Sequence, residues 1–505
     1  MICCSIAIKV YRGVKMQDLH KFGLQDKQLV KQCSYINGTW HSSDTQISVI
    51  NPANGAELAQ VSNAGIVETE LAVRAAKEAL KKWSAKSANE RAVLLRNWFN
   101  LMMQHQDDLG RILTLEQGKS LAEAKGEIAY GAAFIEWFAE EGKRVYGDTI
   151  PAPSGDKRII IIKQAVGVVA SITPWNFPNA MIARKAAAAL AAGCTFVVRP
   201  AILTPLSALA LAELADRAGI PAGVFNVVVG DDAQGMGKVL TQHPDVAKFT
   251  FTGSTPVGKM LINQCATTVK KVSMELGGNA PFIVFDDADI DAAVLGAIVS
   301  KYRNAGQTCV CTNRIFVQHS VLESFTKKFT ASVAELVLGD GLSDGVSIGP
   351  MISSNAVSDV HKLVQDSIAA GAKLVLGGKC DPMGQTFYQP TILSNVTNDM
   401  PIASNEIFGP VSPIIAFDDE DQVIAMANDT EYGLAAYFYA RDIGRIWRVA
   451  EGLEYGMVGI NEGIISNAAA PFGGVKQSGN GREGSKYGLD DYLEIKYLCM
   501  GGLDK

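Results

Sequence analysis

The chain has 505 residues, of which 48% are hydrophobic and 19% are charged, and its formal net charge is −6. This length predicts two or three domains with sizeable cores, and the composition excludes an intrinsically disordered chain. No long basic run and no stretch of ~20 apolar residues occurs, so we expect neither a nucleic-acid partner nor a membrane span.

Nine cysteines are scattered through the chain, and its six histidines form no close-spaced ligand pattern. Sparse cysteines, odd in number, favour a reducing compartment over a disulfide framework, so we expect a cytoplasmic protein. We also expect no metal site. Residues 1–9 lack the basic start and long apolar core of an export signal, and Met16 offers an alternative translation start.

The order of helix-like and strand-like segments predicts an α/β fold. Apolar residues recur at helical spacing over 67–138. From residue 159 onward, short β-branched runs alternate with helical segments, which indicates right-handed βαβ units and a parallel sheet. The expected strands are 166–172, 195–198, 225–229 and 248–251, and the helices between them are 181–192, 205–218 and 234–241.

A second alternation begins near residue 280, after the connector-like glycines of 276–279. We therefore expect two doubly wound parallel-sheet domains in tandem, with their boundary near 276–279. The strands expected in the second domain are 281–285, 312–317, 373–376, 414–417 and 458–461, and its helices are 289–302 and 322–336.

Residues 251–258 (FTGSTPVG) run from a strand into a helix that Ser254 and Thr255 can cap. A helix N-terminus suits a diphosphate, because its free N–H groups and partial positive charge attract anions. The spacing is not the dinucleotide-binding G-x-G-x-x-G, and the P-loop lysine is absent. A plain strand–turn–helix without a ligand-binding role is therefore the alternative interpretation of this segment.

Three further segments carry residues suited to catalysis. Cys309 lies in 306–311 (GQTCVC), and its thiolate would be a strong nucleophile, although a buried cysteine is often only a small hydrophobe. Glu275 precedes two glycines and could act as a general base or form an ordinary ion pair. Asn176 lies in the rigid loop 173–178 (TPWNFP), where its amide could hold an oxyanion or simply support a turn. Cys309 and Cys311 alone are too few ligands for a zinc site. If they lay in a strand, their side chains would both point to the same face of the sheet.

Taken together, these motifs resemble the aldehyde dehydrogenase superfamily, and the likeness runs over about 35–501. Within it, 301–311, 459–466, 471–479 and 481–488 are most similar to the succinate-semialdehyde dehydrogenases. The motifs that carry the wider resemblance are TPWNFP (173–178), FTGS (251–254), ELGG (275–278), GQTC (306–309) and EIFGP (406–410).

The resemblance implies NAD(P)-dependent oxidation of succinate semialdehyde to succinate. Cys309 would attack the aldehyde, Asn176 and the Cys309 N–H would hold the oxyanion, and Glu275 would activate the water that hydrolyses the thioester. Some relatives with Cys-x-Cys are thought to form a blocking disulfide, which makes a redox role of Cys311 a hypothesis here. Glutarate semialdehyde or another carboxylated aliphatic aldehyde is the alternative substrate; a non-redox thiol esterase and a structural homologue are the alternative functions.

The resemblance also assigns binding roles. Arg184, Arg303 and Ser466 match residues that bind a distal carboxylate. The sequence Arg199-Pro-Ala-Ile202 departs from the family, where a lysine begins this motif and a glutamate or serine often ends it. Because Arg199 keeps a positive charge and Ile202 does not repel a phosphate, we favour NADP over NAD. The residues expected at the cofactor are Trp175, Arg199, Gly253, Ser254, Glu406 and Phe408.

The domain organisation implied by the resemblance has three parts. Residues 1–145 and 164–275 would form a cofactor-binding domain, 276–478 a catalytic domain, and 146–163 with 479–505 a β oligomerisation arm. We expect 158–163 to be an exposed strand completed by another chain, in a homodimer or homotetramer.

Overall fold

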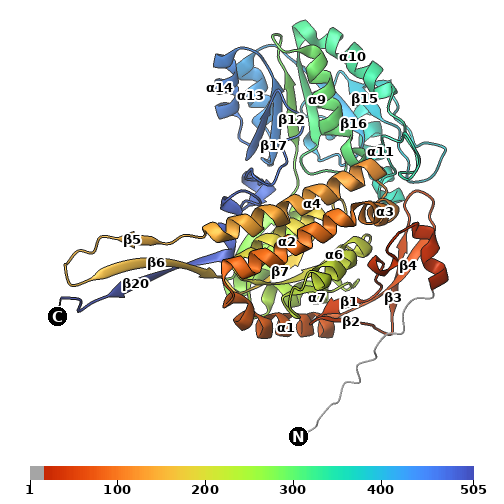
Figure 1. The fold of residues 1–505 in the computed structure, drawn as a ribbon. Coiled ribbons are helices and arrows are strands. Elements are labelled where there is room, and N and C mark those ends of the chain that lie inside the picture. Colours follow the sequence, from red (N-terminus) through yellow and green to blue (C-terminus); the bar gives the residue numbers. More distant parts are fainter. Residues whose placement is uncertain (1–15, 505) are drawn as a thin grey trace.

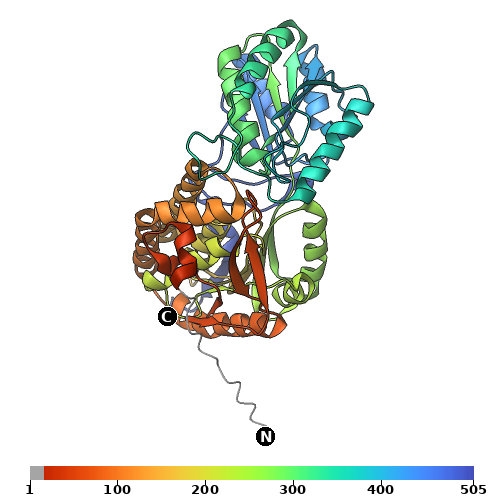
Figure 2. The ribbon, with the colours of Figure 1, turned by 90° about the vertical axis from the view of Figure 1, so that its right-hand side faces the viewer.

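The computed structural model describes residues 16–504. Residues 1–9, in which we infer no export signal, lie outside that range. Figure 1 shows two lobes and a thin arm that projects from the lower lobe, and Figure 2 shows the lobes stacked one above the other. Among the described residues, no helix is both long enough and apolar enough to cross a membrane.

The lower lobe is built on an eight-stranded sheet, ordered β19-β11-β10-β7-β8-β9-β1-β2. Strands β11, β10, β7, β8 and β9 run parallel. Nearly all residues of β7, β8 and β10 are buried, as expected for a parallel sheet with helices on both faces. The strands are β1 (Ser34–Ile36), β2 (Thr39–His41), β7 (Val168–Ile172), β8 (Thr195–Arg199), β9 (Phe225–Val227), β10 (Val246–Thr252), β11 (Lys271–Glu275) and β19 (Gly479–Asn480).

Helices pack around this sheet, and a separate hairpin, β3 (Gln46–Ile50) with β4 (Glu57–Ser62), lies beside it. The helical spacing over 67–138 resolves into four helices separated by short turns. The helices of this lobe are α1 (Ile66–Ser84), α2 (Ala88–Gln104), α3 (Gln106–Gln117), α4 (Leu121–Glu141), α5 (Ala180–Ala192), α6 (Pro205–Arg217), α7 (Ala233–Gln242) and α8 (Thr255–Cys265).

The upper lobe contains a seven-stranded sheet, ordered β14-β15-β16-β13-β12-β17-β18 and parallel except for β14. The chain passes from the first sheet to the second between Glu275 and Ala280. Two parallel-sheet lobes confirm the predicted α/β class. The elements are β12 (Ala280–Val284), α9 (Ile290–Tyr302), β13 (Thr312–Gln318), α10 (Leu322–Ala334), α11 (Ser354–Ala369), β14 (Lys373–Leu376), β15 (Thr391–Ser394), α12 (Pro401–Ser404), β16 (Val411–Phe417), α13 (Glu420–Asn428), β17 (Ala435–Tyr439), α14 (Ile443–Gly452) and β18 (Met457–Ile460).

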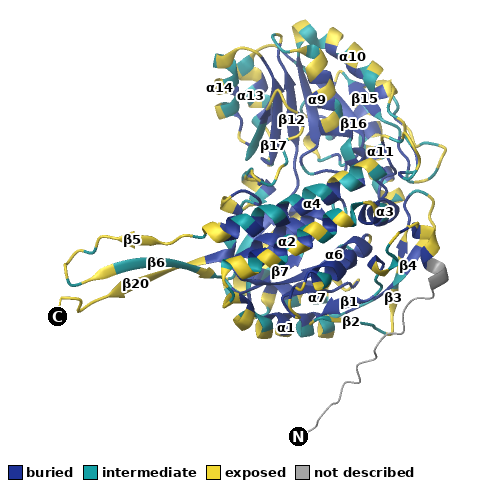
Figure 3. Ribbon diagram, in the orientation of Figure 1, coloured by how far each residue is buried: buried dark blue, intermediate teal, exposed yellow. Residues whose placement is uncertain are grey.

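The arm is a three-stranded antiparallel sheet, and its surface is largely exposed or half-buried (Figure 3). It consists of β5 (Asp148–Ile150), β6 (Arg158–Ala165) and β20 (Leu493–Met500). The expectation that another chain completes strand 158–163 is wrong. β6 is the central strand and is paired on both sides within its own chain, so the free edges belong to β5 and β20.

The C-terminal part of the chain returns to the lower lobe before it enters the arm. β19 pairs with β11 through Met274–Asn480 and Glu275–Gly479, at the edge of the eight-stranded sheet. Residues after 478 therefore lie directly beside the carboxyl end of β11. The assignment of each segment to a domain remains a prediction.

Candidate active site

A cavity of about 550 Å³ takes its walls from both lobes. It lies just past the carboxyl ends of β7 and β10, where open α/β sheets bind ligands. Glu275, Arg199 and Cys311 are not among the residues that line it. The expected site residues that do line it are Trp175, Asn176, Arg184, Gly253, Ser254, Arg303, Cys309, Glu406, Phe408 and Ser466.

Cys309 reaches the cavity through an unusual turn. After α9 the backbone is left-handed at Asn304 (φ 53°), Ala305 (φ 55°) and Gly306 (φ 76°). Such conformations cost about 1–3 kcal/mol each for residues other than glycine and are often found at functional sites. The turn presents half-buried Cys309 to the cavity before β13 begins at Thr312.

Cys311 lies away from the cavity wall. It is buried, and its thiol donates to the carbonyl oxygens of Ser300 (3.0 Å) and Lys301 (2.8 Å). Both cysteines have free thiols. The same-face argument for a strand does not apply, because the strand starts only after Cys311.

Burial raises the pKa of the Cys309 thiol to about 12, and the positive charges of Arg184 and Arg303 offset only part of this effect. At neutral pH the resting cysteine is therefore a thiol. Forming the thiolate requires a change in its surroundings, such as the arrival of a ligand or the loss of the proton to a nearby base.

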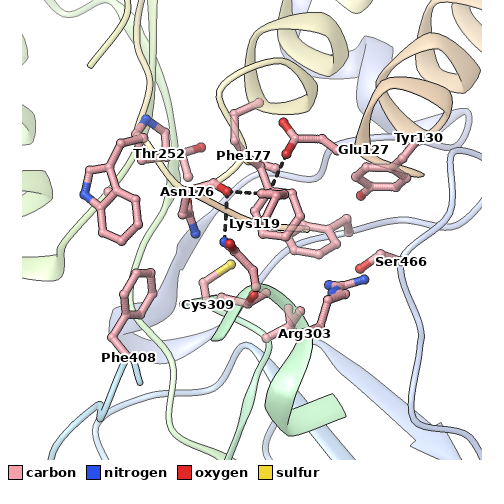
Figure 4. Close-up of a pocket in the computed structure, with 18 of the residues that line it drawn as sticks. Lys119, Glu127, Tyr130, Asn176, Phe177, Thr252, Arg303, Cys309, Phe408 and Ser466 are labelled. Atoms are coloured by element: carbon pink, nitrogen blue, oxygen red, sulfur yellow. Dashed lines mark hydrogen bonds and ion pairs between the residues drawn. The ribbon is translucent and has the colours of Figure 1, made fainter. Parts of the chain in front are cut away.

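Asn176 faces Cys309 from the loop after β7. Its side-chain Nδ2 donates to the carbonyl oxygen of Gln307 at 3.0 Å, and its Oδ1 has no hydrogen-bond partner within residues 16–504. Its backbone carbonyl accepts two hydrogen bonds, from Lys119 Nζ (2.8 Å) and Asn304 Nδ2 (3.0 Å), as Figure 4 shows for Lys119. The asparagine is thus tied to the loop that carries the cysteine.

Glu275 ends β11, buried behind the cavity wall, while the next residues, Leu276 and Gly277, line it. Burial and the nearby Glu483 raise the pKa of the Glu275 carboxyl well above its usual value, although Arg184 and Lys185 act in the opposite direction. This environment favours the neutral form. In this orientation the carboxyl group does not line the cavity that Cys309 lines.

Gly278 allows the close packing behind this site. A Cβ atom added there would lie 2.3 Å from the carbonyl oxygen of Cys309, so any side chain would displace the cysteine. The Gly278 N–H donates to Glu406 Oε1 at 2.9 Å, and burial raises the pKa of Glu406 to about 7.

The expected cofactor residues other than Arg199 gather at one end of the cavity. Ser254 occupies the N-cap of α8, but its side chain makes no capping hydrogen bond, which leaves the first N–H groups of the helix available. Trp175 and Phe408 meet edge to face, with ring centroids 5.7 Å apart. Arg199 ends β8 away from the cavity wall and donates from Nη2 to the Gly230 carbonyl at 2.8 Å. This end offers an anion-binding helix terminus beside an aromatic pair.

The opposite end of the cavity is cationic. Arg184 projects from α5, forms an ion pair with Glu483 and lies 4.6 Å from the Phe472 ring centroid. Within residues 16–504 its Nη1 and Nη2 atoms have no hydrogen-bond partner. Arg303 lies over the Phe177 ring at 5.5 Å. Figure 4 shows Arg303, Ser466 and Tyr130 on the side of Cys309 away from Phe408.

Sequence reasoning missed several polar residues of this site. Glu123, Glu127 and Tyr130 of α4 line the cavity, as does Lys119 just before that helix. The i, i+4, i+7 spacing of the three residues on α4, which places them on one face of the helix, was an available signal. Glu483 left no such signal, because its partners Arg184 and Lys185 lie about 300 residues earlier in the chain.

Comparison with known proteins agrees with this geometry. The model of the aldehyde dehydrogenase family matches residues 40–498. The chain is 61% identical to the succinate-semialdehyde dehydrogenase [NADP(+)] of Escherichia coli, with 95% of this chain and 99% of the relative covered. It is 60% identical to a 3-sulfolactaldehyde dehydrogenase of Pseudomonas putida (95% and 99% covered) and 59% identical to a glutarate-semialdehyde dehydrogenase of Pseudomonas aeruginosa (95% and 100%).

Among solved structures, the succinate-semialdehyde dehydrogenase of Burkholderia pseudomallei superimposes with a TM-score of 0.94 at 57% identity, covering 95% of this chain and 99% of that one. The match of fold, length and sequence extends through both lobes. The chain therefore belongs to the aldehyde dehydrogenase family and is an enzyme of that class.

Proposed function

We propose that this enzyme oxidises an aldehyde with a distal carboxylate, best succinate semialdehyde, to the free acid with NADP or NAD. The observation that carries the proposal is Arg184, whose two unpartnered Nη atoms lie in the same cavity as Cys309. A buried guanidinium with free donors suits a carboxylate, which it can bind in a bidentate manner. Arg303 and Ser466 add a second charge and a hydroxyl.

In the proposed mechanism, Cys309 releases its thiol proton to solvent and its sulfur attacks the aldehyde carbon, which gives the oxyanion of a thiohemiacetal. The side-chain amide of Asn176 and the backbone N–H of Cys309 stabilise the oxyanion. A bound nicotinamide dinucleotide supplies the acceptor for the hydride that leaves this carbon, and a thioester remains on Cys309. Glu275, once it has lost its own proton and turned toward the thioester, takes a proton from the attacking water; the C–S bond then breaks, which releases the acid and restores Cys309.

The residues at the other end of the cavity fit such a dinucleotide. The uncapped N-terminus of α8 at Ser254 would hold the diphosphate, Glu406 the nicotinamide ribose, and Trp175 with Phe408 the apolar rim. We favour NADP, because Arg199 adds positive charge near β8 and the relative from Escherichia coli is named for NADP(+).

Three relatives of nearly equal identity are named for different anionic aldehydes, so the length and shape of the substrate stay open within this class. Glutarate semialdehyde is the second candidate, because one extra methylene is worth only about 1–3 kcal/mol in a pocket. Intact Cys309 and Asn176, together with the dinucleotide-binding features, argue against a non-redox esterase or a structural homologue.

We further propose a homodimer or homotetramer assembled through the arm. β20 exposes apolar side chains such as Ile495 and Tyr497 along a free edge, a pattern typical of a strand that another protein surface covers. Size-exclusion chromatography with light scattering tests this. The cysteines of residues 16–504 are all free, which supports a cytoplasmic location.

The function is tested by following reduction of NADP and of NAD at 340 nm with succinate semialdehyde, glutarate semialdehyde and butanal. We expect fast reduction with the carboxylated aldehydes, slow reduction with butanal, and none in the Cys309→Ala variant. Equal rates with butanal would contradict the role of the arginines. Undiminished activity in Cys309→Ala would contradict the nucleophile.

A further inference from the structure

A buried ion pair lies directly behind the loop that carries Asn176. Lys119 Nζ and Glu127 Oε2 are 2.6 Å apart, and both side chains are essentially inaccessible to solvent. The lysine lies in the turn between α3 and α4, and the glutamate lies two turns into α4. Figure 4 shows the pair beside Asn176 and Phe177, on the wall of the cavity.

Each member of the pair holds one part of this loop. Lys119 donates to the backbone carbonyl of Asn176 at 2.8 Å and lies 3.8 Å from the Phe177 ring centroid. Glu127 Oε1 accepts the backbone N–H groups of Asn179 (3.0 Å) and Ala180 (3.2 Å) at the start of α5. The pair therefore fixes the loop at Asn176 and at its C-terminal end, where α5 begins.

The same carbonyl connects the loop to the nucleophile. Asn304 Nδ2 donates both to the Asn176 carbonyl (3.0 Å) and to the Gln307 carbonyl (3.2 Å), two residues before Cys309. Gln117 Nε2 in turn donates to Asn304 Oδ1 at 2.9 Å. The position of the Asn176 backbone relative to Cys309 thus depends on Lys119 from one side and on Asn304 from the other.

Stability alone does not account for such a pair. Desolvation of two charges offsets most of their attraction, and a buried ion pair is often no more stabilising than an apolar pair of the same volume. An amide that must meet an oxyanion, in contrast, is sensitive to displacement, since an error of about 1 Å can cost about 10²-fold in rate.

We propose that Lys119 and Glu127 are positioning residues that hold the Asn176 amide where the oxyanion forms. The pair does not touch the reacting atoms; it acts through the Asn176 carbonyl and the first N–H groups of α5. This inference rests on the proposed function, because Asn176 must be the oxyanion donor for the pair to matter in this way.

The test is a double-mutant cycle on the full-length enzyme. Lys119→Met alone would leave Glu127 buried and unpaired, so the main variant is Lys119→Met/Glu127→Gln, which removes both charges. It is made in the parent and in Asn176→Ala. The matched control neutralises an exposed ion pair that joins α3 to α4, Lys125→Met/Asp107→Asn. The measurements are kcat/KM for the aldehyde, KM for the dinucleotide, the thermal midpoint, and the rate at which iodoacetamide alkylates Cys309.

In the parent we expect the neutral pair to lower kcat/KM by about 30- to 100-fold, since loss of one oxyanion donor costs about 10²–10³-fold. In Asn176→Ala the same change should cost less than threefold, and alkylation and KM for the dinucleotide should stay within a factor of two. The control should behave as the parent.

Three results would overturn the inference. An equal loss in both backgrounds would show a merely structural role, and full activity in the neutral-pair variant would show no role at all. An Asn176→Ala variant with full activity would instead refute the proposed oxyanion role of Asn176, and with it the function that the pair is inferred to serve.

Discussion

Replacing Arg303 with glutamine is expected to weaken the use of succinate semialdehyde while leaving butanal almost unaffected. Of the two arginines, Arg303 is the one whose replacement disturbs fewer buried partners. Arg184 is paired with Glu483, so its removal would leave this buried carboxylate with Lys185 as its remaining ion-pair partner and would disturb the buried cluster. Arg303 stacks on Phe177 and is half-buried on the cavity wall.

The magnitude follows from charge and burial. A carboxylate about 4 Å from the guanidinium, at an effective dielectric constant of about 20, is attracted by about 4 kcal/mol. The loss of hydration of both charges offsets part of this attraction. The net contribution of a hydrogen bond to a charged group is about 1.5–3 kcal/mol. A loss of about 2–3 kcal/mol corresponds to a fall of about 30- to 150-fold in kcat/KM.

The assay compares kcat/KM for succinate semialdehyde and for butanal, which replaces the carboxylate with a methyl group. The ratio is the readout, because Arg303 also lowers the pKa of Cys309 and that effect acts on both substrates equally. Most of the loss should appear in KM, since the distal charge is the same in the ground state and the transition state. An equal fall for both aldehydes would refute the reasoning and would place Arg303 in support of the nucleophile instead.

Three further predictions concern the nucleophile and the cofactor. Because the Cys309 pKa is about 12, only roughly one thiol in 10⁵ is ionised at pH 7. The rate at which Cys309 is alkylated, followed by peptide mass spectrometry, should therefore rise about tenfold per pH unit from pH 7 to 9. A pH-independent rate would contradict the raised pKa. Cys311→Ala should recover far less activity with dithiothreitol after peroxide treatment, since no disulfide would then protect Cys309 from overoxidation; full recovery would exclude the redox link. Ile202→Glu should lower kcat/KM for NADP relative to NAD by about tenfold through a repulsion of about 1.4 kcal/mol, and an unchanged ratio of initial rates would place the 2′-phosphate elsewhere.

Most of the parallel strands of both sheets were predictable because each is a short, largely apolar run bounded by turn residues, whereas β11 was not predicted. The run 195–198 lies within β8, and the run 281–285 overlaps β12. β15 (TILS) and β17 (AAYFY) were missed although both are largely buried, because each is only four or five residues long and contains small or polar residues that weaken the apolar signal. The pairing of β6 on both sides was not predictable, since its partner β20 lies more than 300 residues away in the sequence.

The candidate site also has parts that the sequence predicts and parts that it does not. Motif residues such as Cys309, Asn176 and Glu406 could be named from short segments, and they line one cavity. The environment of each group could not be predicted, because it depends on burial and on distant partners. The raised pKa of Glu275 comes from its burial near Glu483, and the backbone of Asn176 is held by Lys119.

The ion pairs of Glu483 with Arg184 and Lys185 have a consequence for synthesis of the chain. The residues of the pair with Lys185 lie 298 positions apart, so at about 5–20 residues per second the ribosome adds the glutamate roughly 15–60 s after the lysine. Until then, α5 carries two cations that can be buried only at high cost. The first lobe to be translated is thus completed by nearly the last residues to emerge, and a nascent chain that stops before Glu483 would present an open α5 to chaperones and proteases.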